Sequence, residues 1–156
     1  PRLASEYENF LITLGQIKSP EKRIRLFETL KDLGAKLPVI ISPLAYISKH
    51  AKIEEGTVVM HYVLVNAGAK IGKNCIINSN ALIEHDAIVA NHCHIATGAT
   101  LSGGVTVGEN VLVGAGATVI EYKSIADNVI IGAGSVVVED IPAPGIYTGV
   151  PAKKIK

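Results

Sequence analysis

The sequence predicts a mainly β fold, a left-handed parallel β-helix of six-residue repeats that follows a small N-terminal β-α-β fragment. Three observations support this prediction. Aliphatic residues recur at every sixth position from Ile47 to Val137. A small or β-branched residue follows most of them four positions later. Aromatic residues make up only 4% of the chain and Trp is absent, which suits repetitive packing better than an ordinary mixed core.

The N-terminal fragment spans residues 1–45 and has one predicted helix between two predicted strands. Residues 9–14 form a short apolar run, and residues 36–41 form a second one. In the helix between them, Ser19 is expected to cap the first turn and Gly34 to end the last. The apolar residues of this helix fall on one face: Ile24, Phe27, Leu30 and Leu33. The fragment resembles the last part of a small nucleotide-binding unit, although none of its residues indicates a ligand.

The repeat and its C-terminal tail occupy residues 46–156. Sixteen positions spaced by six are all aliphatic: Ile47, Ile53, Val59, Val65, Ile71, Ile77, Ile83, Val89, Ile95, Leu101, Val107, Val113, Val119, Ile125, Ile131 and Val137. Neither a helix nor an ordinary strand produces this spacing, whereas a hexapeptide β-helix does. Three hexapeptides make one triangular coil, so residues three hexapeptides apart stack at about 4.8 Å. We expect roughly five coils, with Lys123 as an irregularity and the end of the coil at Gly145.

Composition excludes several classes of function. The 15 Lys and Arg residues nearly balance the 14 Asp and Glu residues, so no bulk charge attracts nucleic acid or an anionic membrane. No apolar stretch approaches the roughly 20 residues needed to span a bilayer, so we expect no membrane insertion. Cys75 and Cys93 are three hexapeptides apart and are expected to stack in the core as reduced residues. A cytoplasmic protein is the resulting expectation.

The repeat and the C-terminal Gly149-Val-Pro-Ala-Lys-Lys-Ile resemble the bacterial hexapeptide-repeat acyltransferases. Three motifs are similar to one branch, the sialic acid O-acetyltransferases and UDP-4-amino-sugar N-acetyltransferases: Ile83-Glu-His-Asp, Asn91-His-Cys-His and Leu101-Ser-Gly-Gly-Val. The similarity runs from about Phe10 to the C-terminus. It implies a homotrimer that holds acetyl-CoA between neighbouring prisms.

Acetyl transfer from a thioester needs a base for the proton of the acceptor and a hydrogen-bond donor for the oxyanion. His85 lies two residues after the inward Ile83, and Glu84 and Asp86 flank it. The resemblance implies that His85 is the general base and that Asp86 raises its basicity. Gly103 follows His85 by three hexapeptides, so its N–H is expected one coil away as the oxyanion donor. The alternative for Gly103 is an ordinary turn glycine.

The resemblance also implies a set of cofactor-binding residues: His94, Gly103, Ala115 and Ala133. His94 is expected near a corner of the prism, close to the thioester. Ala115 and Ala133 belong to a column of small residues, which suits either the pantetheine arm of CoA or close packing of subunits. A zinc site at His92 and His94, or the three-histidine zinc site of a γ-class carbonic anhydrase, is the rival interpretation. No third ligand follows at a sensible spacing, so we expect no metal.

The remaining candidates carry weaker signals. The resemblance assigns no role to His50, His61 or His92, and these residues are expected to be solvated at the surface. Lys153 and Lys154 either meet CoA phosphates or are merely solvated.

The predicted function is acetyl-CoA-dependent N-acetylation of an amino group on a nucleotide-linked sugar, in surface glycan biosynthesis. We expect direct transfer, with His85 as base and no acyl-enzyme. O-acetylation of a sialic-acid-like sugar and a non-catalytic β-helix assembly module are the alternatives. The resembling enzymes begin with a Gly-rich turn that holds the nucleotide, and this chain shows none. Either those residues precede the present chain, or the acceptor is held differently.

Overall fold

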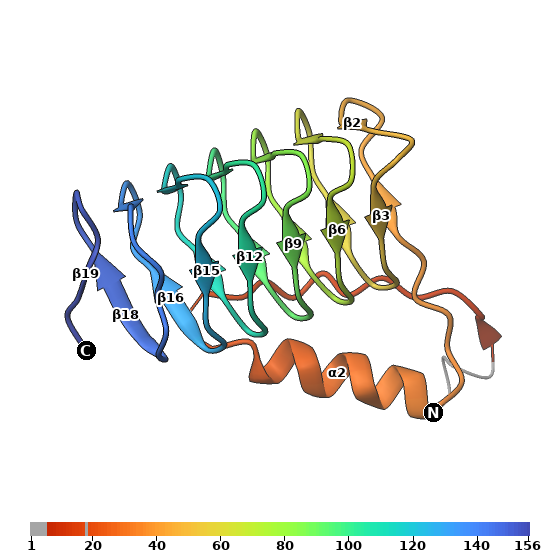
Figure 1. Cartoon of the computed structure of the whole chain (residues 1–156). Helices are drawn as coiled ribbons and strands as arrows, with labels where there is room; N and C mark the ends of the chain where they lie inside the picture. The colour runs from red at the N-terminus through yellow and green to blue at the C-terminus, as the bar shows by residue number, and fades with distance from the viewer. Residues whose placement is uncertain (1–5, 18) are drawn as a thin grey trace.

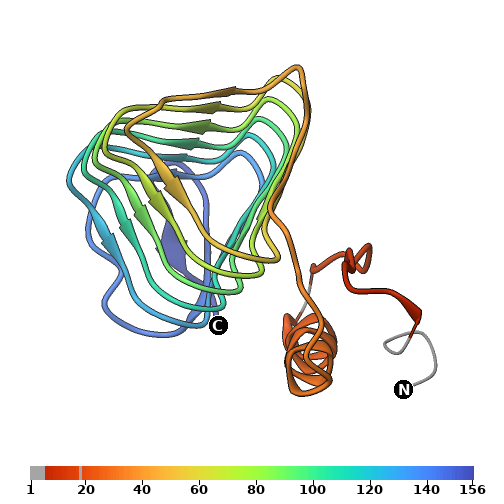
Figure 2. The same ribbon diagram turned by 90° about the vertical axis from the view of Figure 1, so that its right-hand side faces the viewer.

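The chain winds into a three-sided parallel β-helix, with an α-helix beside it (Figure 1). The structure is a computed structural model that describes residues 6–17 and 19–156, so the first five residues of the predicted N-terminal fragment lie outside the described residues. Seen along its axis, the chain traces stacked triangles (Figure 2). Strands three hexapeptides apart in the sequence pair in parallel, as Ile40 does with Val58. This confirms the predicted period and is consistent with a left-handed β-helix.

Three sheets form the walls of the prism. Wall 1 contains β1 (Ile40–Ile41), β4 (Val58–Val59), β7 (Ile76–Ile77), β10 (His94–Ile95), β13 (Leu112–Val113), β16 (Val129–Ile131), β18 (Gly145–Thr148) and β19 (Lys153–Lys154). Wall 2 contains β2 (Tyr46–Ile47), β5 (Leu64–Val65), β8 (Leu82–Ile83), β11 (Thr100–Leu101), β14 (Thr118–Val119) and β17 (Val136–Val137). Wall 3 contains β3 (Lys52–Ile53), β6 (Lys70–Ile71), β9 (Ile88–Val89), β12 (Thr106–Val107) and β15 (Ser124–Ile125). The turns between them are called corner 1/2, corner 2/3 and corner 3/1.

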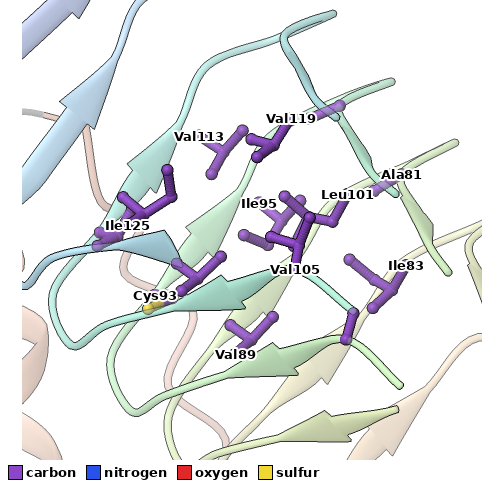
Figure 3. Close-up of a cluster of buried hydrophobic side chains, with 14 of the residues drawn as sticks. Ala81, Ile83, Val89, Cys93, Ile95, Leu101, Val105, Val113, Val119 and Ile125 are labelled. Atoms are coloured by element: carbon purple, nitrogen blue, oxygen red, sulfur yellow. The ribbon is translucent and has the colours of Figure 1, made fainter. Parts of the chain in front are cut away.

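The predicted aliphatic positions form the core of the prism (Figure 3). From Val59 to Val137 each of them is at most 3% exposed. Ile47 and Ile53, in the first coils, are half-buried and pack against the same core. Complete burial of such a side chain contributes about 1.5 to 3 kcal/mol, so the stack of aliphatic residues stabilises the coils.

The two cysteines lie inside this core, as predicted. Both are fully buried. The Sγ–H of Cys75 donates to the carbonyl of Ala90 at 3.2 Å, and that of Cys93 donates to the carbonyl of Gly108 at 3.0 Å. They are therefore small packing residues.

The coil extends further than predicted at its C-terminal end. Lys123 does not interrupt it, because its carbonyl accepts the N–H of Thr106 at 2.9 Å. The expected end at Gly145 is wrong, because β18 begins there and pairs in parallel with β16. Ile131 pairs with Tyr147, which comes two positions earlier than the regular register requires, and the buried tyrosine replaces an aliphatic residue in the shortened coil. From β1 to β18 the chain makes about six coils rather than five.

The predicted helix is present as α2 (Glu21–Asp32) and runs beside the stack (Figures 1 and 2). Ser19 Oγ accepts the N–H of Glu21 at 3.2 Å, and the chain leaves the helix at Gly34. The expected apolar face is only partly correct. Phe27 is buried, but Leu33 is 42% exposed, and the most deeply buried residue of the helix is Arg23. Within the described residues, no helix is long and apolar enough to cross a membrane.

Of the two strands predicted beside this helix, the one over residues 9–14 is wrong and the one over residues 36–41 is correct only at its end, in β1. Residues 9–17, called here the N-terminal arm, contain only a single parallel bridge between Asn9 and Lys36. Further along the arm, the carbonyls of Ile12 and Leu14 accept hydrogen bonds from the Arg23 guanidinium at 2.8 and 2.9 Å. A side chain thus takes the place of a strand partner. Within the other predicted strand, the residues of β1 belong to wall 1 of the β-helix.

Candidate active site

Corner 2/3 brings His85 against Gly103, as their spacing of three hexapeptides predicts. A methyl group built on Gly103 would lie 2.6 Å from His85 Nε2 and 2.7 Å from Cε1. The imidazole therefore occupies the space that any side chain at this position would fill. Gly103 is buried, and glycine is required here because the ring approaches its backbone so closely.

Asp86 fixes the orientation of the imidazole. Its Oδ2 lies 3.0 Å from His85 Nδ1, and both side chains are more than half exposed. A carboxylate at Nδ1 favours a proton on that nitrogen, so Nε2 is left with its lone pair. Nε2 is also the nitrogen that lies over Gly103. The ring thus directs a proton acceptor toward the Gly103 backbone.

Glu84 completes the polar cluster at this corner, and sequence reasoning gave it no role. Its Oε2 accepts the N–H of His85 at 3.2 Å and the Nδ2–H of Asn66 at 2.9 Å. Asn66 precedes Glu84 by three hexapeptides, so the repeat would have predicted this pair. Through these two bonds Glu84 connects the backbone of His85 to Asn66 of the preceding coil.

The N–H of Gly103 is available to a ligand. At the same corner position one and two coils earlier, side chains occupy the N–H groups: Glu84 Oε2 takes that of His85, and Asn66 Oδ1 takes that of Ala67 at 2.8 Å. Among the hydrogen bonds of the described residues, none has the Gly103 N–H as donor. A backbone N–H directed at a reacting carbonyl is the usual way to stabilise an oxyanion.

His94 lies on a different part of the prism from His85 and Gly103. It is the first residue of β10 in the middle of wall 1, which is the wall opposite corner 2/3, so the expected position near a corner is wrong. The N-terminal arm covers it. His94 Nδ1 donates to the carbonyl of Gln16 at 2.6 Å, and Nε2 lies 3.4 Å from Nδ2 of Asn78. Burial lowers the pKa of His94, and the bond to Gln16 only partly opposes this. His94 is therefore neutral, with Nε2 as an acceptor.

A cavity of about 340 Å³ lies between the N-terminal arm and wall 1. Its lining is mainly apolar, and its larger polar side chains are those of Arg23, Asn78 and His94. The residues that line it are Leu11, Ile12, Thr13, Leu14, Gly15, Arg23, Val58, Met60, Ile76, Asn78 and His94. The guanidinium of Arg23 is already engaged by backbone carbonyls. Asn78 and His94 are thus the side chains best able to meet a polar ligand there.

The predicted column for CoA runs down corner 1/2. Ala115 and Ala133 are exposed, as is Thr97 one coil before Ala115. One edge of wall 2 therefore carries this column, and the other edge carries His85 with Gly103. A single chain does not bring the two edges together.

The other predicted polar residues differ in their surroundings. His50 and His61 are exposed, as expected. His92 is half-buried, so the prediction that it is solvated at the surface is wrong. The ring of Phe27 packs edge-on against its imidazole, with 5.8 Å between the ring centroids, and Asn74 Nδ2 lies 3.0 Å from its Nδ1. Lys153 is exposed and lies 3.5 Å from Glu139.

The described residues contain no group of three or more His, Cys, Asp or Glu side chains that could hold a metal ion.

The repeat matches a known family model. The model described as bacterial transferase hexapeptide (six repeats) matches residues 50–85 and 68–103. No curated protein matches the chain.

Several solved structures are similar to the chain over nearly its whole length. A mutant of perosamine N-acetyltransferase from Caulobacter crescentus, in complex with CoA and GDP-perosamine, is 35% identical over 97% of this chain and 71% of that chain, with a TM-score of 0.92. The acetyltransferase domain of PglB from Neisseria gonorrhoeae FA1090, in complex with acetyl coenzyme A, is 36% identical over 99% of this chain and 76% of that chain, with a TM-score of 0.91. WeeI from Acinetobacter baumannii AYE is 24% identical and shows the same fold, with coverages of 89% and 68% and a TM-score of 0.85.

Proposed function

The chain belongs to the bacterial hexapeptide-repeat acetyltransferases, and we propose that it transfers the acetyl group of acetyl-CoA to an amino group on a nucleotide-linked sugar. The observation that carries this proposal is the geometry of corner 2/3. There His85 Nε2 lies over Gly103, whose N–H donates no hydrogen bond within the described residues. A proton acceptor and an oxyanion donor in contact are what acyl transfer requires.

In the proposed mechanism the acceptor amine attacks the thioester carbonyl directly. His85 Nε2 takes a proton from the attacking nitrogen, while the Gly103 N–H stabilises the oxygen that becomes negative. The tetrahedral intermediate then expels the CoA thiolate, which receives a proton, and the amide remains on the sugar. Asp86 stabilises the imidazolium through Nδ1, at 3.0 Å in this structure. A base placed in this way contributes on the order of 10² to 10⁴ in rate.

The carboxylates beside the base favour an amine over a hydroxyl as acceptor. Glu84 and Asp86 flank His85, so this corner carries two negative charges next to the proton acceptor. Such charges stabilise the positive charge that develops on an attacking amine nitrogen. The similar enzyme bound to GDP-perosamine is itself named an N-acetyltransferase, which supports the same choice.

A homotrimer would unite the two edges of wall 2. In a ring of three parallel prisms whose walls 2 face the axis, corner 2/3 of one chain meets corner 1/2 of the next. His94 follows His85 by nine residues and precedes Gly103 by nine, so on the neighbouring chain it lies midway between their levels. Its acceptor nitrogen would then face the reacting groups, and Ala115 and Ala133 would line the path of CoA. The apolar outward residues of wall 2, Tyr46, Leu64 and Leu82, suit such an interface.

A cytoplasmic location is part of the proposal, because acetyl-CoA and nucleotide-linked sugars are supplied there.

The function is tested by thiol release from acetyl-CoA, with a 4-amino sugar linked to UDP or GDP as the acceptor. We expect turnover by the unmodified protein and a loss of about a hundredfold or more in His85→Ala. His50→Ala is the matched control, because His50 is another exposed histidine on corner 2/3. The product should resist mild alkali, as an amide does. An alkali-labile product would indicate O-acetylation instead. Equal turnover by His85→Ala would show that His85 is not the base, and no turnover above background by the unmodified protein would favour a non-catalytic assembly module.

Subunit mixing tests whether the site is shared between chains. His85→Ala and His94→Ala chains are each expected to be weakly active alone. Mixed trimers contain interfaces with both histidines intact, so an equal mixture should regain about a quarter of the unmodified activity. No recovery after verified subunit exchange would place both histidines' functions within one chain and contradict the shared site.

A further inference from the structure

Tyr122 lies one coil beyond Gly104 on corner 2/3 and has no role in the proposed mechanism. Its side chain is 72% exposed, and its backbone has φ +58°. Glycine occupies the equivalent corner position in two earlier coils, at Gly68 and Gly104. A bulky residue is disfavoured in this left-handed conformation, and burial of the Tyr122 side chain does not offset the strain.

The tyrosine ring is held against the reacting corner. A methyl group built on Gly104 would lie 2.5 Å from Cδ1 and 2.6 Å from Cε1 of Tyr122, so the ring covers this glycine. The backbone N–H of Tyr122 donates to the Gly103 carbonyl at 3.0 Å, and the N–H of Gly104 donates to the His85 carbonyl at 2.9 Å. The two glycines therefore lie between the imidazole on one side and the phenol ring on the other.

We infer that the Tyr122 ring is a binding surface for the donor, against which the pantetheine arm of acetyl-CoA lies next to its thioester. This inference rests on the proposed function, because it takes the thioester to be at Gly103. From there the arm can leave along the corner in two directions. Toward the earlier coils it meets the His85 ring and the carboxylates of Glu84 and Asp86, a charged and solvated surface that packs poorly against methylene groups. Toward the later coils it meets Tyr122.

The facing wall of the proposed trimer supports the same direction. In parallel prisms the height of a residue along the axis increases with its residue number. Ala115 of the neighbouring subunit therefore lies at a height between those of Gly103 and Tyr122. An arm that descends from Gly103 would pass between the small Ala115 on one side and the tyrosine ring on the other. An aromatic face packs well against the methylene and amide groups of pantetheine, and the hydroxyl can pair with an amide.

Tyr122→Asn tests this role with little risk to folding, because asparagine already occupies the same backbone conformation at Asn74, Asn80, Asn110 and Asn128. Tyr62→Asn is the matched control. Tyr62 has φ +59° and is 63% exposed, but it lies on corner 1/2, more than one coil before His85.

The measurement is the Kd of CoA for the assembled full chain by calorimetry, together with KM for acetyl-CoA. We expect Tyr122→Asn to raise both by about fivefold, with KM for the acceptor unchanged. Tyr62→Asn should change neither, and Tyr122→Phe should keep most of the affinity.

An unchanged Kd in Tyr122→Asn would overturn the inference while leaving the proposed function in place. A loss in Tyr122→Phe as large as that in Tyr122→Asn would overturn the packing role of the ring. Failure of the unmodified protein to bind CoA would instead overturn the proposed function, so the two failures are distinguishable.

Discussion

Corner 2/3 and wall 1 both present a histidine, yet the two side chains differ in almost every physical respect. His85 at the corner is more than half exposed and has a carboxylate at Nδ1. His94 on wall 1 is only 9% exposed, beneath the N-terminal arm, and its Nδ1 has a backbone carbonyl as partner. Both arrangements leave Nε2 as an acceptor. A carboxylate can stabilise an imidazolium, whereas burial disfavours it, so only His85 is suited to take up a proton during turnover.

The comparison shows that the same repeat can produce two kinds of site. A corner presents side chains in columns, and their neighbours three hexapeptides away are part of the repeat itself. Wall 1 is flat, and the segment that covers it carries no repeat. Chemistry at the corner is therefore set by the coil, whereas chemistry at wall 1 is set by how the arm docks.

The largest expected effect concerns the contact at the corner. Gly103→Ala should lower kcat/KM by about 10² to 10³, because its methyl group would displace the His85 ring and crowd the oxyanion site. Folding should be preserved, since Ala67 already holds this corner position two coils earlier. The measurement is a double-mutant cycle with His85→Ala.

If the contact with the imidazole is the cause, the Gly103→Ala, His85→Ala double variant should be little worse than His85→Ala alone. Fully additive losses would contradict the coupling of Gly103 to His85. Thermal unfolding of each variant serves as the control for stability.

A smaller effect is expected at the base of the arm. Arg23 is 1% exposed and donates to the carbonyls of Ile12, Leu14, Gly56 and Asn74 at 2.8 to 3.4 Å. Arg23→Met should weaken docking of the arm by on the order of 3 kcal/mol, because these buried acceptors lose charged donors. Hydrogen exchange should show faster exchange in the arm and α2, with the coils unchanged.

Arg25→Met is the matched control for this prediction, since Arg25 is an exposed residue of the same helix. Equal protection of the arm in both variants would contradict the role of Arg23. Uniform loss of protection through the prism would show that the arm and the coils unfold as one unit.

The smallest expected effect is a dependence of arm docking on pH. Burial lowers the pKa of both His92 and His94, so each binds its proton more readily when the arm is released. Docking should therefore be complete above the ordinary histidine pKa of about 6.5 and weaken as the pH falls below it. Arg23 disfavours both protonated forms, while Glu28 and Glu109 partly favour that of His92.

Limited proteolysis of the arm at pH 5 and pH 8 measures this effect. Cleavage, normalised to that of an unstructured peptide at each pH, should be faster at pH 5, and core amides such as that of Val113 should have equal protection factors at both values. Equal cleavage rates would contradict the proposed dependence on the two histidines.

The accuracy of prediction from sequence follows the same division. The core positions and the contact of His85 with Gly103 were correct, because both depend only on a constant register of three hexapeptides. The strand predicted within the arm, the corner position of His94 and the solvated His92 were wrong. Each of those depends on where a segment without a repeat crosses the prism. The end at Gly145 was also wrong, because the chain makes one further coil, shortened by two positions around Tyr147.

The sequence by itself therefore determined the prism, its walls and the column that holds the base, since a period of six leaves only one way to bury every aliphatic position. Only the tertiary structure decided the course of the N-terminal arm, the backbone partners of Arg23 and the neutral state of His94. The physical reason is that hydrogen bonds between segments far apart in the chain depend on docking, and docking leaves no period in the sequence.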